Sequence, residues 1–160
     1  MKILGIDPGY AIVGYGVIEY NQNHFKTIDY GAILTDKDTP FPQRLKQIYD
    51  KTTQLINIHK PEYLSIEELF FNTNVKTAIA VGHARGVLLL AAEQAGIPIY
   101  EYTPLQIKQA VTGYGRADKH QVQQMMKTLL GLPSVPKPDD TADALAVAIC
   151  HAHSFRQNIY

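Results

Sequence analysis

The order of apolar and polar residues along the chain predicts strands first and alternating helices and strands afterwards. Short apolar stretches bounded by turn residues occupy the N-terminal region, and longer stretches with apolar residues three or four positions apart follow them. Asn21-Gln22-Asn23 is a turn signal between two short stretches and predicts a hairpin. The five predicted strands are residues 2–7, 12–20, 25–35, 63–67 and 97–102.

Proline and capping residues mark the ends of the predicted helices. Pro40 and Pro42 begin the first helical pattern, and Pro61 ends it. Thr103 followed by Pro104 has the form of a helix cap with proline at the first helical position. The order of elements predicts an α/β fold, with a mixed sheet that contains a hairpin and is flanked by helices. The predicted helices are residues 42–60, 73–95, 103–112, 118–131 and 139–155.

The segment 73–95 is apolar on nearly all sides of its predicted helix. Such a helix must be buried on all sides, whereas a single sheet can cover only one of its faces. Gly82 and Gly86 lie four residues apart and would let a second helix approach closely. We therefore expect two copies of the chain to pack through this helix as a two-fold dimer. A helix wholly internal to one chain is the alternative.

Four acidic side chains stand where buried elements are predicted to end or begin. Asp7 ends the first apolar run, before the turn pair Pro8-Gly9, and Glu67 ends a later one. Asp140 and Asp143 open the last predicted helix and point the same way, because they are three residues apart. A carboxylate at the tip of a buried strand is costly to desolvate unless a cation lies beside it. The four acids could converge on one pocket, which would need divalent cations.

Carboxylates that hold paired divalent cations are the usual apparatus of enzymes that cut phosphodiester bonds, so these acids predict a nuclease. Each acid taken alone has another interpretation. Asp7 suits a turn, Glu67 could reach water from a strand end, and Asp140 could cap a helix. Asp143 lies one turn inside an apolar helix and is harder to explain without a ligand.

The composition is that of an ordinary globular protein. The length suits a single domain, residues 1–160, with 46% hydrophobic and 19% charged residues. The N-terminal apolar run is too short for a signal peptide, and the longest apolar stretch, GVLLLAA, is too short to cross a membrane. Cys150 is the single cysteine, so no intrachain disulfide can form, and we expect it to be a small buried thiol. These features predict a cytoplasmic protein with no membrane partner.

The net charge is zero, from 15 basic and 15 acidic residues, which by itself argues against DNA binding. The distribution of charge reverses this interpretation, because setting the four candidate ligands aside leaves an excess of bases. The bases gather in two stretches that bracket the predicted pocket, 69–92 and 105–128, where we expect contacts to phosphate. The candidate DNA-binding residues in these stretches are Lys76, Arg85, Lys108, Tyr114, Arg116 and Lys119.

Five motifs in series resemble the RuvC family of Holliday-junction resolvases. In order they are ILGIDPGYAIVGYGVI, LSIEELFF, GHARGVLLLAA, YTPLQIKQAVTGYGRADKHQVQ and DDTADALAVAI, and the likeness covers nearly all of residues 1–153. The resemblance implies an RNase H-like, mixed five-stranded sheet flanked by helices. It also implies an endonuclease that resolves four-way DNA junctions in homologous recombination and DNA repair, as a homodimer that works with the branch-migration proteins RuvA and RuvB.

The resemblance also assigns roles to particular positions. Two Mg²⁺ ions per site, for which Mn²⁺ can substitute, would support in-line attack by water and leave a 5′-phosphate and a 3′-hydroxyl. Asp139 and Glu68 are the alternative ligands, although successive strand residues face opposite ways, so only one of Glu67 and Glu68 can face the site. The catalytic and metal-binding residues that the resemblance implies are Asp7, Glu67, Asp140 and Asp143.

Three further positions match the family around this site. Lys108 and Lys119 match lysines near the active site, where they would contact phosphate and stabilise charge in the transition state. Phe70 matches an aromatic residue that stacks on bases at the opened junction, and Phe71 beside it would then be a core residue.

Other functional classes fit parts of the sequence. The motif GIDPG also resembles the first phosphate loop of actin-like ATPases, but that fold needs two such domains, which 160 residues cannot supply. A junction-binding scaffold without catalysis would gain DNA affinity by losing the four acids, so their presence argues against it. Other RNase H-like nucleases, such as transposases, are alternatives by fold.

Overall fold

The computed structural model describes residues 1–69 and 75–157, and its strands form one mixed sheet. The strands are β1 (Lys2–Asp7), β2 (Ile12–Asn21), β3 (His24–Leu34), β4 (Tyr63–Glu67) and β5 (Ile99–Tyr102). Their order across the sheet is β3-β2-β1-β4-β5. The first three strands pair antiparallel, whereas β4 runs parallel to β1 and β5 runs parallel to β4. The predicted five-stranded mixed sheet is confirmed.

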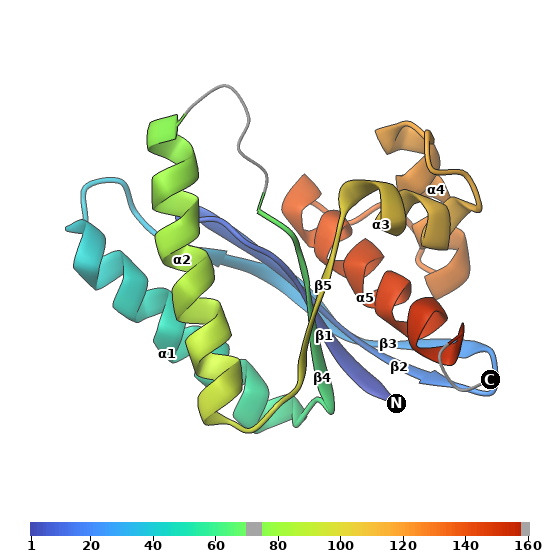
Figure 1. Cartoon of the computed structure of the whole chain (residues 1–160), viewed down its shortest axis with the longest axis horizontal. Coiled ribbons are helices and arrows are strands. Elements are labelled where there is room, and N and C mark those ends of the chain that lie inside the picture. Colours follow the sequence, from blue (N-terminus) through green and yellow to red (C-terminus); the bar gives the residue numbers. More distant parts are fainter. Residues whose placement is uncertain (70–74, 158–160) are drawn as a thin grey trace.

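Helices cover both faces of the sheet (Figure 1). They are α1 (Phe41–His59), α2 (Val75–Gln94), α3 (Pro104–Thr112), α4 (Lys119–Leu130) and α5 (Asp139–Gln157). Helices α1 and α2 pack on one face, and α3, α4 and α5 pack on the other. Thr103 and Asp118 begin α3 and α4 with capping boxes, since each side chain accepts a hydrogen bond from the backbone three residues on.

The strands direct alternate side chains into two hydrophobic cores. In β1, Leu4 and Ile6 pack toward α1 and α2, whereas Ile3 packs toward α5. This alternation places Asp7 on the face that α5 covers. In β4 the same alternation places Glu67 on that face, because Ser65 two residues before it donates a hydrogen bond to the carbonyl oxygen of Val147 in α5, at 3.1 Å.

Glycines in β1 and β2 let α5 lie directly on the sheet. A Cβ atom at Gly5 would lie 2.2 Å from the carbonyl oxygen of Ala144, and one at Gly14 would lie 1.9 Å from that of Asp140. Because both contacts are with backbone atoms of α5, a side chain at either position would force the helix away from the sheet. Gly14 pairs with Asp7 across the β1–β2 ladder. The first turn of α5 therefore lies against the end of β1, where Asp7 is placed.

Helix α5 is buried along most of its length, and Cys150 lies within it. Burial raises the pKa of the Cys150 thiol to about 12, although a hydrogen bond with Ser154 opposes the shift. A thiol that stays protonated near neutral pH is a poor nucleophile. The prediction of a small buried thiol is confirmed.

Helix α2 is only partly covered by the rest of the chain. Val75, Ile79 and Leu90 lie on one side of it and are 64%, 54% and 51% exposed. The alternative of a helix wholly internal to one chain is therefore wrong. Among the described residues, α2 is also long and apolar enough to cross a membrane by length and composition alone. That evidence is weak, because core helices of soluble proteins meet the same criteria.

Candidate active site

Two strand ends and the first turns of α5 bring four carboxylates together. The parallel register of β1 and β4 aligns Ile6 with Ile66, so Asp7 and Glu67 follow side by side at the same end of the sheet. Asp140 and Asp143 approach from α5, which the glycines of β1 and β2 hold close to the strands. The structure thus gathers the four acids that the sequence singled out.

The pKa of Asp7 shows how closely these acids interact. Burial and, in decreasing order of effect, the negative charges of Asp143, Asp140 and Glu67 together raise its pKa to about 8. A hydrogen bond with the side chain of Asp140 acts in the same direction. Because one carboxyl group responds to the other three, the four share a single electrostatic pocket.

Two lysines border this pocket. Burial raises the pKa of Glu67, and the charge of Asp143 adds to the shift, while Lys108 on α3 and Lys119 on α4 oppose it. Burial likewise raises the pKa of Asp143, and Lys119 opposes that shift most strongly. The pocket therefore combines crowded negative charge with two cations at its rim, as expected for a site that binds both a cation and a phosphate.

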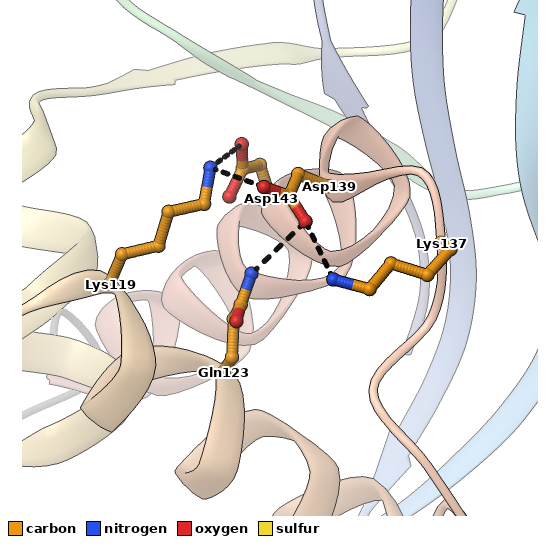
Figure 2. A network of polar contacts seen from close by, with 5 residues as sticks. All are labelled: Lys119, Gln123, Lys137, Asp139 and Asp143. Carbon is orange, nitrogen blue, oxygen red and sulfur yellow. Dashed lines mark hydrogen bonds and ion pairs between the residues drawn. The ribbon is translucent and has the colours of Figure 1, made fainter.

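Asp139 lies at the rim of the pocket. Its Oδ2 atom is 3.2 Å from Nζ of Lys119, and its Oδ1 atom is 3.1 Å from Nζ of Lys137 (Figure 2). Hydrogen bonds from Lys137 and then Lys119 are the main causes that lower its pKa. Asp140 is instead hydrogen-bonded to Asp7. This arrangement favours Asp140 over Asp139 as a member of the carboxylate cluster.

Glu67 is favoured over Glu68 in the same way. Glu67 shares the α5-facing side of β4 with Ser65, and its charge affects Asp7. The backbone N–H of Glu68 donates to the carbonyl oxygen of Tyr102 at 2.9 Å, which continues the pairing of β4 with β5. Adjacent residues in an extended backbone direct their side chains to opposite faces, which favours Glu67 alone on the α5 side.

The carboxylates share an electrostatic pocket without being set at coordination distance from one ion. Within residues 1–69 and 75–157, no three His, Cys, Asp or Glu side chains are arranged to hold a metal ion. Asp143 is engaged by Lys119, whose Nζ atom lies 3.6 Å from its Oδ2 atom. Side-chain rotation, including release of this ion pair, would be needed to form a coordination sphere.

Sequence comparison assigns the chain to a family. Residues 3–151 match the family described as "RuvC: Crossover junction endodeoxyribonuclease RuvC". Curated relatives with that name from Alkaliphilus oremlandii and Ruminiclostridium cellulolyticum are 64% and 60% identical, over 96% and 98% of this chain and 94% of each relative. The chain belongs to the RuvC family.

Solved structures agree with membership of the RuvC family. The structure described as T. thermophilus RuvC in complex with Holliday junction substrate matches with a TM-score of 0.95 at 36% identity, covering 99% of this chain and 96% of that chain. The yeast mitochondrial Holliday junction resolvase Ydc2 shares the fold, with a TM-score of 0.68 at 14% identity, over 97% of this chain and 80% of that chain. The predicted family and fold class are confirmed.

The remaining candidate DNA-binding residues differ in position. Lys76 and Arg116 are exposed, and Tyr114 is 56% exposed in the connection between α3 and α4. Arg85 is only 7% exposed, and its Nη2 atom lies 3.0 Å from Oε1 of Glu101 on β5. The position of Arg85 does not support the predicted DNA contact, because its guanidinium is directed into the fold. Phe70 and Phe71 lie outside the described residues.

Sequence reasoning missed the residues that seat and flank the carboxylates. Gly5 and Gly14 have no side chains and so allow the backbone of α5 to lie directly on the sheet. Ser65 links β4 to α5 through its hydrogen bond to Val147. Glycines in two apolar strand segments are a sequence signal for the close approach of another backbone. The contact of Lys137 with Asp139 had no comparable signal, since the connector before α5 has no periodic pattern.

Proposed function

We propose that this member of the RuvC family resolves four-way DNA junctions by cutting two strands with a divalent-metal-dependent site. The observation that carries the proposal is the single pocket formed by Asp7, Glu67, Asp140 and Asp143, with Lys108 and Lys119 at its rim. The names of the curated relatives and the junction-bound RuvC structure support the same activity. A cytoplasmic role in recombination and repair accords with it.

The four carboxylates are the residues that would hold the metal. Their donor atoms are hard oxygens, which suit Mg²⁺ or Mn²⁺. The raised pKa of Asp7 fits this role, because burial and three neighbouring charges make the fully ionised cluster unfavourable unless cations neutralise it. When bound, two such ions supply Lewis-acid activation of water and charge stabilisation for phosphodiester hydrolysis.

The protein's own side chains complete the proposed chemistry. Lys108 and Lys119 approach the pocket from α3 and α4, where each ammonium can contact a phosphate oxygen beside the carboxylates. The N-terminal end of α4 carries the partial positive charge of a helix start, which also favours a phosphate nearby. The expected products are a 5′-phosphate and a 3′-hydroxyl.

A two-fold dimer through α2 would supply the second cut. Val75, Ile79, Gly86 and Leu90 recur at helical spacing along one exposed side of α2. A second copy packed there would bury these side chains and give each dimer two pockets, one for each strand to be nicked. Docking of RuvA and RuvB stays a prediction from the resemblance.

The proposal is tested by cleavage of end-labelled DNA. Purified protein with Mg²⁺ should introduce paired nicks at symmetric positions of a four-way junction, leave ligatable 5′-phosphate ends, and spare a linear duplex of the same sequence. EDTA should abolish cutting. Equal cutting of the linear duplex would favour another RNase H-like nuclease, and tight junction binding without any cutting in Mg²⁺ or Mn²⁺ would favour a non-catalytic scaffold.

A further inference from the structure

The ammonium group of Lys119 lies between two carboxylates of α5. Its Nζ atom is 3.2 Å from Oδ2 of Asp139 and 3.6 Å from Oδ2 of Asp143. The two acids are four residues apart, so they lie on the same side of the helix and flank the ammonium (Figure 2). Asp143 belongs to the carboxylate pocket, whereas Asp139 is half-exposed at its rim. Lys119 therefore connects the pocket with an acid outside it.

Asp139 is held in place by donors from other segments. Its Oδ1 atom accepts hydrogen bonds from Nζ of Lys137 at 3.1 Å and from Nε2 of Gln123 at 3.5 Å. Gln123 lies one turn beyond Lys119, so α4 directs two donors at the same carboxylate (Figure 2). Lys137 comes from the connector that precedes α5. The position of Asp139 is thus fixed with respect to α4 as well as α5.

We propose that Asp139 is a positioning residue that holds the Lys119 ammonium when divalent cations occupy the neighbouring pocket. The inference rests on the proposed metal site. A cation bound by Asp143 would compete with the ammonium for the same oxygens and repel it. With Asp139 adjacent, Lys119 can release Asp143 and still keep an anionic partner at the rim, where a phosphate would arrive. Without Asp139, Lys119 would pair with Asp143 alone and oppose cation binding.

A second explanation is that Asp139 attracts cations through its negative charge without involving Lys119. The two explanations predict different coupling between the residues. If Asp139 acts through Lys119, its removal has no effect on cation binding once the lysine has lost its charge. If the charge of Asp139 acts directly, its removal has the same effect whether or not Lys119 is charged.

The test is a double-mutant cycle read by Mn²⁺ binding to the full chain, from the paramagnetic resonance signal of free Mn²⁺. Asp139→Asn should raise the Mn²⁺ dissociation constant about two- to fivefold, the scale of one exposed ion pair. In a Lys119→Gln background, Asp139→Asn should change it by less than the measurement error. In the matched Lys137→Gln background, which also lacks one lysine charge beside Asp139, the effect should persist.

A second measurement uses the four-way junction. The Mn²⁺ concentration that gives half-maximal cleavage should rise in Asp139→Asn by the same factor as the dissociation constant. Thermal unfolding in EDTA provides the check on folding, because a loss of fold would lower the melting temperature whereas a positioning role would not. An equal effect of Asp139→Asn with and without Lys119, or no effect in either background, would overturn the inference.

Mn²⁺ binding by Asp7→Asn shows whether a failed test counts against the role of Asp139 alone or against the proposed metal site as well. Loss of Mn²⁺ binding in Asp7→Asn would uphold the metal site, so that a failed double-mutant cycle would then count against the role of Asp139 alone. Mn²⁺ binding by Asp7→Asn with the affinity of the wild type would refute the proposed metal site and the inference together.

Discussion

Helices α2 and α5 are both rich in apolar residues, yet the chain covers them differently. From Thr141 to Ala152, α5 is buried at every position except Asp143, which faces the carboxylate pocket. Helix α2 leaves Val75, Ile79 and Leu90 exposed along one side. A single chain therefore completes the surroundings of α5 but not those of α2. Apolar composition alone does not separate a core helix from one with a face left for a second copy, whereas the pattern of exposed positions does.

The different packing suits different tasks. The backbone of α5 packs directly against glycines of the sheet. This close packing fixes the positions of Asp140 and Asp143 relative to Asp7 and Glu67. Helix α2 packs against α1 on the opposite face of the sheet. We infer that its outward side joins two subunits. Substitutions that disturb α5 should therefore abolish cleavage at each active site. Substitutions on the outward side of α2 should separate the two subunits and leave each active site intact.

The largest effect is expected from the acids that α5 contributes. Asp143→Asn should lower the cleavage rate by more than the ~10–100-fold typical of residues that only support metal ligands. Junction binding should be unchanged or tighter, because a charge that repels phosphate is removed. The control is Asp50→Asn, which removes an exposed acid of α1 and should cut like the wild type. Wild-type cutting by Asp143→Asn would show that this residue is no ligand.

The next largest effect is loss of dimerisation, which we expect from a charge placed on the exposed side of α2. In the single chain, a Cβ atom at Gly86 would have no other atom within 4 Å, apart from its chain neighbours and the backbone of its own helix. Gly86→Glu should therefore fold but fail to dimerise, because an unpaired carboxylate buried at an interface costs several kcal/mol. Sedimentation should show monomers, and the junction should be nicked without paired cuts.

A matched control for that variant is Gln54→Glu, which adds the same charge to an exposed position of α1. It should remain dimeric and make paired cuts. A wild-type protein that is monomeric while it makes paired cuts would contradict the role given to α2.

The raised pKa of Asp7 predicts a pH dependence of stability in EDTA. Because the folded state holds this proton up to a pKa of about 8, unlike the unfolded chain, the free energy of unfolding should fall as pH rises between about 4 and about 8. The loss should be on the order of a few kcal/mol. Asp7→Asn should flatten this slope, as measured by urea denaturation across the pH range. A wild-type slope in Asp7→Asn would mean that Asp7 is not the group that holds this proton in the folded state.

A smaller loss of stability should follow when α5 is displaced from the sheet. Gly14→Ala places a methyl group against the carbonyl oxygen of Asp140 and should lower the free energy of unfolding by ~1–3 kcal/mol, the usual cost of overpacking. Cleavage should fall as well, because Asp140 moves relative to Asp7. Gln54→Ala, at an exposed position of α1, is the control and should leave the free energy of unfolding close to that of the wild type. Equal unfolding free energies for Gly14→Ala and the wild type would contradict the close packing of α5 against Gly14.

Local patterns predicted the elements of the fold well. The strands and helices followed from apolar spacing and from caps such as Thr103 and Asp118. Asp7 and Glu67 stood out because each ends an apolar run, and the family motifs separated Asp140 from Asp139. The structure agrees with that choice, since Asp140 interacts with Asp7 while Asp139 is held by lysines.

Contacts between distant segments could not be predicted in this way. Arg85 was assigned to DNA because its stretch of sequence lacks acids, yet its partner Glu101 comes from a strand that follows α2 in the sequence. The role of Gly14 depends on which helix crosses β2, and the role of Lys137 depends on how the connector approaches α5. Each of these contacts is set by the packing of whole elements, which local periodicity does not contain.

The most direct test of the central claim is a crystal structure with Mn²⁺, in which anomalous scattering locates the metal. We expect manganese peaks within coordination distance of carboxylate oxygens from Asp7, Glu67, Asp140 and Asp143, with the Lys119 ammonium withdrawn from Asp143. Manganese bound elsewhere, or bound by Asp139 in place of Asp140, would contradict the site described for this chain.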